Sequence, residues 1–89
     1  MITQLKNESD IENLNDGILY FTAKWCKKCQ IEYNELCELV EQKKCSCLKI
    51  DIDDYSDLSV EYEIEKLPTY IEIKNNKIFK KCTSIKCLQ

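Results

Sequence analysis

The hydrophobic pattern along the chain changes period near residue 29. Before that point, Ile18 to Phe21 form an apolar run without alternation, which is typical of a strand buried on both faces of a sheet. After it, apolar residues recur three and four positions apart through about Gln42, while most glutamates lie off that stripe, so this segment is predicted to be an amphipathic helix. The sequence Cys26-Lys27-Lys28-Cys29 must therefore lie in the first turn of a long helix, directly after a buried strand.

Weaker patterns predict the other elements. Alternating or apolar runs indicate four more strands, and short capped segments indicate two more helices. The strands are expected at residues 2–5, 47–52, 69–73 and 78–82, the helices at 9–14 and 56–63, and a hairpin turn at 74–77. The predicted order is β-α-β-α-β-α-β-β, a parallel start closed by an antiparallel hairpin. A chain of this length is expected to form a single domain over residues 1–89.

Composition excludes several kinds of chemistry. The chain has no histidine, which rules out Ser–His and Cys–His catalysis and every His-ligated metal site, and its single glycine rules out a Gly-rich phosphate loop. A net charge of −3 and the absence of arginine argue against nucleic acid as a partner. No apolar segment resembles a membrane span or a signal peptide, so we expect no membrane partner and a cytoplasmic location.

Seven cysteines are many for a chain of 89 residues. The odd count, the lack of a signal peptide and the many helix- and strand-forming residues argue against a secreted disulfide scaffold. In a reducing compartment such cysteines are mostly thiols, and closely paired ones are catalytic, metal-binding or spare.

The spacing of Cys26 and Cys29 suits thiol–disulfide exchange, which needs one thiolate to attack and a second thiol near enough to resolve the mixed disulfide. The unpaired N–H groups and partial positive charge of a helix N-terminus favour a thiolate at Cys26, while Cys29 lies one turn further in and suits the resolving step. The three neighbouring lysines should lower the thiol pKa further; they are Lys24, Lys27 and Lys28.

Two other interpretations of this pair remain open. A zinc ion would need four thiolates because the chain has no histidine, and Cys82 and Cys87 belong to a distant strand. A chance pair in a Cys-rich chain would leave an inactive scaffold. We expect redox chemistry, with no metal and no cofactor other than the Cys26–Cys29 disulfide, and Trp25 would offer a flat apolar surface to an extended substrate.

The buried strand, the Trp25-to-Cys29 segment, the long helix and a late Leu67-Pro68-Thr69 follow one another in order, and in this the chain resembles the thioredoxin family over roughly residues 1–86. The resemblance implies an α/β, three-layer thioredoxin fold, a central mixed sheet with helices on both faces. It also implies that Pro68 is a cis-proline packed against the cysteine pair, and that Leu67, Pro68 and Thr69 bind substrate as an added strand. The implied partners are protein disulfides and thioredoxin reductase or another dithiol donor.

The chain departs from the family pattern at several positions. The family's Gly-Pro between the cysteines is Lys27-Lys28, its buried acid near the resolving cysteine falls on Tyr20, and a neighbouring lysine is kept as Lys49. Lys49 is therefore grouped with the other three lysines as a residue that tunes the thiol pKa. The final helix is reduced to residues 85–89, which would leave one apolar sheet face partly bare and favour weak self-association.

Two other functions fit parts of the sequence. A glutaredoxin-like, glutathione-dependent reductase would suit the short length, but no glycine pair follows Pro68 to seat the tripeptide. A non-catalytic binding module on the same fold would use the groove between Trp25 and Pro68 without thiol chemistry.

The remaining cysteines and the aspartate cluster receive simpler interpretations. Cys37 lies on the apolar stripe of the long helix and is expected to fill the core. Asp51, Asp53 and Asp54 follow a strand and are expected to be a solvated run before a helix. Cys82 and Cys87 are either spare thiols or a second redox pair.

Overall fold

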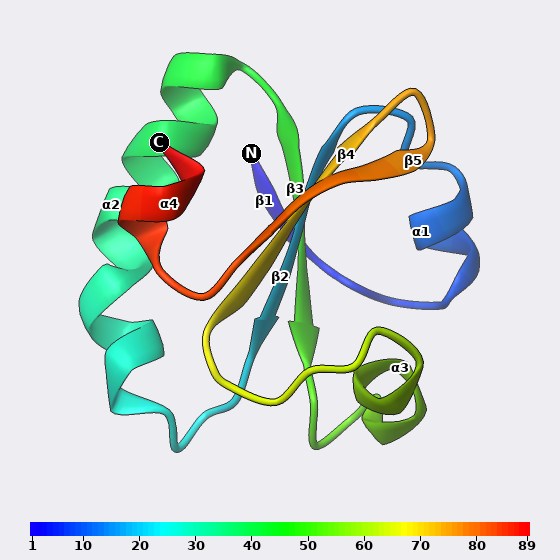
Figure 1. The fold of residues 1–89 in the computed structure, drawn as a ribbon, viewed down its shortest axis with the longest axis vertical. Helices are drawn as coiled ribbons and strands as arrows, with labels where there is room; N and C mark the ends of the chain where they lie inside the picture. The colour runs from blue at the N-terminus through cyan, green and yellow to red at the C-terminus, as the bar shows by residue number, and fades with distance from the viewer.

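The computed structural model describes residues 1–89 as a five-stranded sheet with helices on both faces (Figure 1). β1, β3 and β2 are parallel neighbours, whereas β4 pairs antiparallel with both β2 and β5. The mixed sheet agrees with the α/β fold expected from the sequence. The strands, in the spatial order β1-β3-β2-β4-β5, are β1 (Ile2–Gln4), β3 (Ser46–Asp51), β2 (Gly17–Thr22), β4 (Thr69–Lys74) and β5 (Lys77–Cys82).

The helices form the two outer layers. α2 (Lys27–Lys43) and α4 (Ile85–Leu88) lie on one face of the sheet, and α1 (Ser9–Glu12) and α3 (Ser56–Glu61) lie on the other (Figure 1). The three-layer arrangement is the one that the resemblance implied. None of these helices is both long enough and apolar enough to cross a membrane.

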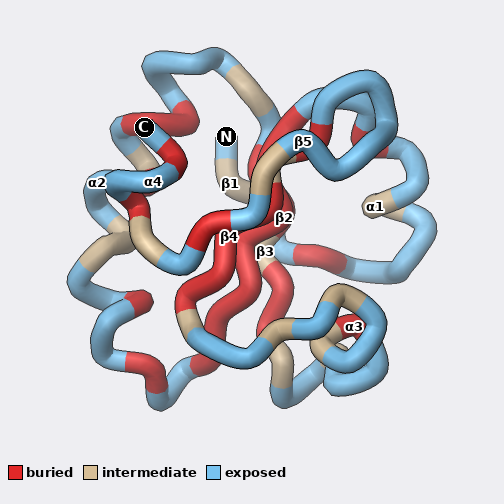
Figure 2. The backbone as a smooth tube through the Cα atoms, in the orientation of Figure 1, coloured by how far each residue is buried: buried red, intermediate tan, exposed pale blue.

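β2 is the central strand, and all six of its residues are buried (Figure 2). Ile18 and Tyr20 belong to the cluster that faces α2 and α4, whereas Leu19 and Phe21 belong to the cluster on the side of α3. Successive side chains of a strand point to opposite faces, so a strand with a helical layer on each side must be apolar at every position. This confirms the prediction made from the unbroken apolar run.

α2 buries Cys29, Leu36, Leu39 and Val40. The predicted stripe named Cys37 in place of Leu39, but Cys37 is a half-buried free cysteine. The difference arises because Leu39 packs in the same cluster as the two apolar residues of α4, an element that the helical period of α2 could not reveal.

α4 covers part of the sheet face that was expected to be partly bare. Ile85 and Leu88 are almost fully buried in the cluster that contains Leu36 and Val40 of α2. Three positions apart in one helical turn, the two side chains face the same way and cover part of the sheet. Ile78 and Phe79 of β5 stay 57% and 60% exposed, so the expected weak self-association remains a prediction.

Two local features explain the chain path around β2 and β4. A Cβ atom on Gly17 would lie 2.5 Å from the Ser46 carbonyl oxygen, so only glycine fits where β2 begins beside β3. The hairpin between β4 and β5 turns through Asn75 and Asn76, whose φ angles are 52° and 62°. Asparagine tolerates this left-handed backbone, which confirms the predicted turn.

Candidate active site

Cys26 is the N-cap of α2, so the helix begins where the cysteine pair begins. Its backbone is extended, with φ −83° and ψ 106°, and its sulfur accepts the N–H of Cys29 at 3.2 Å. The two cysteines are joined by a disulfide, with their Cα atoms 5.3 Å apart. Cys26 is 7% exposed and Cys29 2%, which agrees with the predicted order of accessibility. The first turn of α2 holds no acidic residue, so nothing there opposes an anion at Cys26.

The four predicted tuning lysines occupy different surroundings. Lys24 and Lys27 are exposed beside the pair. The Lys28 ammonium donates to the Thr83 carbonyl at 3.2 Å, which ties it to the C-terminal segment. The Lys49 ammonium lies 5.5 Å from the centre of the Tyr33 ring, and Lys49 lines the same cavity as Cys29. Their effect on the thiols stays a prediction.

Trp25 stands exposed next to Cys26, with 65% of its surface accessible. Its indole N–H donates to the Asp53 carboxylate at 3.1 Å, and this bond fixes the ring against the segment that follows β3. No local pattern could reveal this pairing, because the two residues are 28 positions apart.

The aspartates after β3 are not one solvated run. Asp53 and Asp54 are exposed as expected, but Asp51 is buried and accepts the N–H of Asp53 at 2.8 Å. Asp51 is the last residue of β3 and pairs with Thr22 of β2, so the interpretation of it as solvated is wrong.

The segment Leu67-Pro68-Thr69 reaches the cysteine pair through Leu67. Leu67 packs on the small cluster formed by Ala23, Cys26 and Cys29. The Leu67–Pro68 peptide is cis, as the resemblance implied, and Pro68 is fully buried. Thr69 begins β4, and its hydroxyl donates to the Lys66 carbonyl at 2.5 Å. The fold thus brings residues about 40 positions apart in the chain to one end of the sheet.

A cavity of about 450 Å³ lies beside Cys29. Tyr20, at the position of the family's buried acid, lines it and stacks on Tyr70, with ring centres 5.5 Å apart. Burial raises the pKa of Tyr20, so its hydroxyl stays protonated at neutral pH. Asp51 is the only carboxylate that lines this cavity, and it faces the same space as Lys49. Sequence reasoning missed Asp51 because burial at the end of a strand depends on the neighbouring strand.

Comparison with known proteins gives a consistent result. The thioredoxin family model matches residues 2–87. Mitochondrial thioredoxin of Mus musculus is 38% identical over 71 residues, covering 78% of this chain and 43% of that protein. Thioredoxin 2 of Plasmodium berghei is 41% identical over 66 residues, covering 72% and 42%. The chain thus spans less than half the length of these relatives.

A solved structure shows the same fold. The oxidised mitochondrial thioredoxin 3 of Saccharomyces cerevisiae superposes with a TM-score of 0.86 at 24% identity, covering 98% of this chain and 89% of that chain.

Proposed function

Because the chain belongs to the thioredoxin family, we propose that it is a thiol–disulfide oxidoreductase acting on protein disulfides through Cys26 and Cys29. The observation that carries this proposal is the disulfide across the first turn of α2, with Cys26 as the helix N-cap. A helix N-terminus stabilises a thiolate there, and the second sulfur is within bonding distance of the first.

In the reducing direction, the Cys26 thiolate attacks one sulfur of the substrate disulfide. The substrate S–S bond breaks, its other sulfur leaves as a thiolate, and a mixed disulfide with Cys26 remains. Cys29 then loses its proton and attacks the Cys26 sulfur, which expels the second substrate thiolate and forms the Cys26–Cys29 disulfide. Two electrons pass from the protein to the substrate, and every step is reversible.

Cys29 must give up its thiol proton before it can attack, so the resolving step needs a proton acceptor near this buried sulfur. Tyr20 cannot take this proton at neutral pH, since its hydroxyl is already protonated. We assign the role to Asp51, the carboxylate on the wall of the cavity beside Cys29, with water in the cavity carrying the proton. Asp51→Asn keeps an oxygen for the Asp53 N–H and should slow release of the mixed disulfide without preventing its formation.

Substrate would lie across Trp25 and the segment Leu67-Pro68-Thr69. Trp25 offers an exposed apolar ring, Leu67 lies next to the cysteine cluster, and Thr69 begins β4. An extended substrate backbone could pair there as an added strand. The proposed partners are protein disulfides and thioredoxin reductase or another dithiol donor. The cytoplasmic location remains a prediction, and several relatives are mitochondrial by name.

Trapping the mixed disulfide tests the proposal. Cys29→Ser should accumulate a covalent adduct with a protein disulfide such as insulin, whereas Cys26→Ser should not. The matched control is Cys37→Ser, which changes a half-buried free cysteine of the same helix. Intact-mass spectrometry identifies the adduct. Adducts on Cys26→Ser alone would reverse the assigned roles, and failure of the wild type to reduce insulin would favour the non-catalytic binding module. Reduction by glutathione alone would favour the glutaredoxin-like alternative.

A further inference from the structure

A second disulfide joins Cys82, at the end of β5, to Cys87 in α4. The Cα atoms are 5.8 Å apart and the pair closes a loop of only a few residues. The two halves differ in access: Cys82 is 2% exposed, whereas Cys87 is exposed. A reagent can therefore approach the pair from Cys87.

This disulfide tethers α4, a helix that is too short to be stable by itself. A four-residue helix is far shorter than an isolated helix needs to be in water. Two apolar anchors, Ile85 and Leu88, hold α4 against the sheet. The Ser84 hydroxyl caps it by accepting the Cys87 N–H at 3.4 Å. The disulfide adds a covalent link to this short set of contacts.

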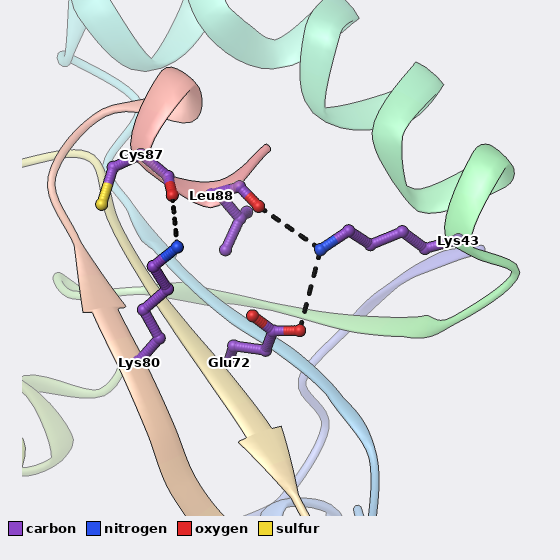
Figure 3. Close-up of polar contacts among 5 residues, drawn as sticks. All are labelled: Lys43, Glu72, Lys80, Cys87 and Leu88. Atoms are coloured by element: carbon purple, nitrogen blue, oxygen red, sulfur yellow. Dashed lines mark hydrogen bonds and ion pairs between the residues drawn. The ribbon is translucent and has the colours of Figure 1, made fainter.

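Lysine side chains bind the C-terminal carbonyl groups of α4 (Figure 3). Lys80 donates to the Cys87 carbonyl at 2.8 Å, and Lys43 donates to the Leu88 carbonyl at 3.3 Å. Lys43 also lies 3.7 Å from the Glu72 carboxylate of β4. The Cys87 sulfur points away from the Lys80 contact, so this contact does not cover it (Figure 3). The Lys80 bond is exposed, and an exposed contact of this kind contributes little in water.

The other end of the segment is tied to α2. The Glu32 carboxylate accepts the Ile85 N–H at 3.0 Å and the Tyr70 hydroxyl at 2.8 Å, and Lys28 donates to the Thr83 carbonyl at 3.2 Å. Lys28 and Lys80 thus place two ammonium groups on the carbonyls of residues 83 and 87, around the disulfide. Nearby cations favour a thiolate, which is the leaving group when a disulfide is attacked.

We propose that Cys82–Cys87 is a second thiol–disulfide exchange site, reduced by an external dithiol through Cys87, and that its reduction releases α4 from the sheet. One thiolate of the dithiol attacks the Cys87 sulfur, the Cys82–Cys87 bond breaks, and Cys82 leaves as a thiolate and takes up a proton. The second thiol of the reductant then attacks the reductant sulfur that is bonded to Cys87, which frees Cys87 as a thiol. The dithiol is oxidised to a disulfide, and the protein gains two electrons and two protons.

Release follows from chain entropy. While the bond is intact, the ends of the short loop cannot separate. Without it, opening gains the entropy of an unconstrained tail, which for so short a loop favours opening by about 10- to 100-fold. Exchange of the amides that are hydrogen-bonded in docked α4, those of Ile85, Cys87 and Gln89, should accelerate by the same factor.

The experiment uses the full chain carrying Cys26→Ser and Cys29→Ser, in which Cys82–Cys87 is the remaining disulfide. Because these substitutions remove the proposed catalytic pair, the result is independent of the proposed function. The protein is equilibrated in buffers of reduced and oxidised dithiothreitol, alkylated and cut with trypsin. Cleavage after Lys81 and Lys86 places Cys82 and Cys87 in separate peptides, which stay joined only by an intact disulfide. Amide exchange is followed by NMR in the same buffers.

We expect the two peptides to separate in reducing buffer while the protein stays folded, with Cys87 alkylated before Cys82. Exchange at Ile85, Cys87 and Gln89 should rise about 10- to 100-fold, and exchange at Leu19 in the central strand should not change. Adding Cys87→Ser, which alters only the exposed member of the pair, should give the fast exchange in both buffers.

Two results would overturn the proposal. The peptides could stay joined until the protein unfolds, which makes the bond a permanent staple, or the α4 amides could exchange equally in both states. If the variant with Cys26→Ser, Cys29→Ser and Cys87→Ser does not fold, the wild-type chain is used in the same buffers. Peptide mapping then distinguishes the two disulfides and shows whether Cys82–Cys87 is reduced.

Discussion

The two disulfides of this protein sit on elements that are held in different ways. Cys26–Cys29 spans the first turn of a 17-residue helix that buries four residues in the core, so α2 stays in place whether or not the bond exists. Cys82–Cys87 ends on a four-residue helix held by two buried side chains. A redox change at Cys26–Cys29 therefore changes the reactivity of the cysteines while α2 stays in place. A redox change at Cys82–Cys87 instead changes how α4 is held against the sheet.

The free energies that hold α4 in place support this contrast. Burial of an aliphatic side chain contributes about 1.5–3 kcal/mol, so Ile85 and Leu88 together supply only a few kcal/mol against the cost of ordering the tail. Closing a short loop with a disulfide contributes about 2 kcal/mol in the chain-entropy model. The covalent bond is thus comparable with everything else that holds α4.

The largest effect is expected from removing the nucleophile. Cys26→Ser should lower the rate of insulin reduction by a factor of about 10³ or more, because a hydroxyl at this position is not ionised at neutral pH. Cys37→Ser should stay close to the wild-type rate. An insulin turbidity assay with dithiothreitol measures both. Equal losses in the two variants would remove the distinction between the active-site pair and the other cysteines.

Cavity substitutions in α2 and α4 should differ in their effect on stability. Leu36→Ala should lower the free energy of unfolding by about 2–5 kcal/mol, because the surrounding core cannot close the gap. Leu88→Ala should cost less when the Cys82–Cys87 disulfide is reduced, since undocking of α4 then limits the loss. Urea unfolding of both variants in reducing buffer measures the difference. Equal costs would show that α4 belongs to the same cooperative unit as α2.

The buried free thiol of Cys47 should make the stability of the protein depend on pH. Burial raises the pKa of Cys47 to about 12 from its ordinary value of 9.0. Above pH 9 the unfolded chain loses this proton before the folded chain does, so the unfolded state binds fewer protons and stability falls as pH rises toward 12. The contribution of Cys47 to this loss should be about 1.4 kcal/mol at pH 10.

The matched variant is Cys47→Ala, which should show a weaker loss of stability between pH 9 and pH 10 than the wild type. Urea unfolding at each pH gives the comparison. Burial also raises the pKa of Tyr20 and Tyr70, so part of the wild-type dependence above pH 10 should remain in the variant. An unchanged dependence on pH would contradict the assignment to Cys47.

The smallest expected effect concerns the two lysines between the active-site cysteines. Lys27→Gln with Lys28→Gln removes two cations, destabilises the thiolate form and should lower the reduction potential by about 30 mV, toward the value of about −270 mV typical of thioredoxins. Lys74→Gln, on β4 far along the chain, serves as the charge control. Equilibration of each variant against glutathione buffers measures the potential. A wild-type value already at −270 mV would show that Lys27 and Lys28 do not tune it.

The sequence alone determined the β2–α2 junction and the position of the cysteine pair on it. β2 is buried on both faces and α2 on one face, so the spacing of apolar residues along each segment identifies it as strand or helix. The position of Cys26 at the N-terminus of α2 follows from where the helical spacing begins. The Asn75-Asn76 turn was equally predictable, because backbone preference belongs to the residue itself.

Only the tertiary structure decided how the C-terminal segment docks and what surrounds Cys29. Glu32 looked like one of several solvent-facing glutamates, yet it bonds Tyr70 and Ile85, which lie 38 and 53 positions away. Asp51 is buried because β3 ends beside β2, and α4 covers part of the face that its shortness seemed to leave bare. A local pattern records whether a residue is buried, but its partner is set by packing between elements, which no single segment encodes.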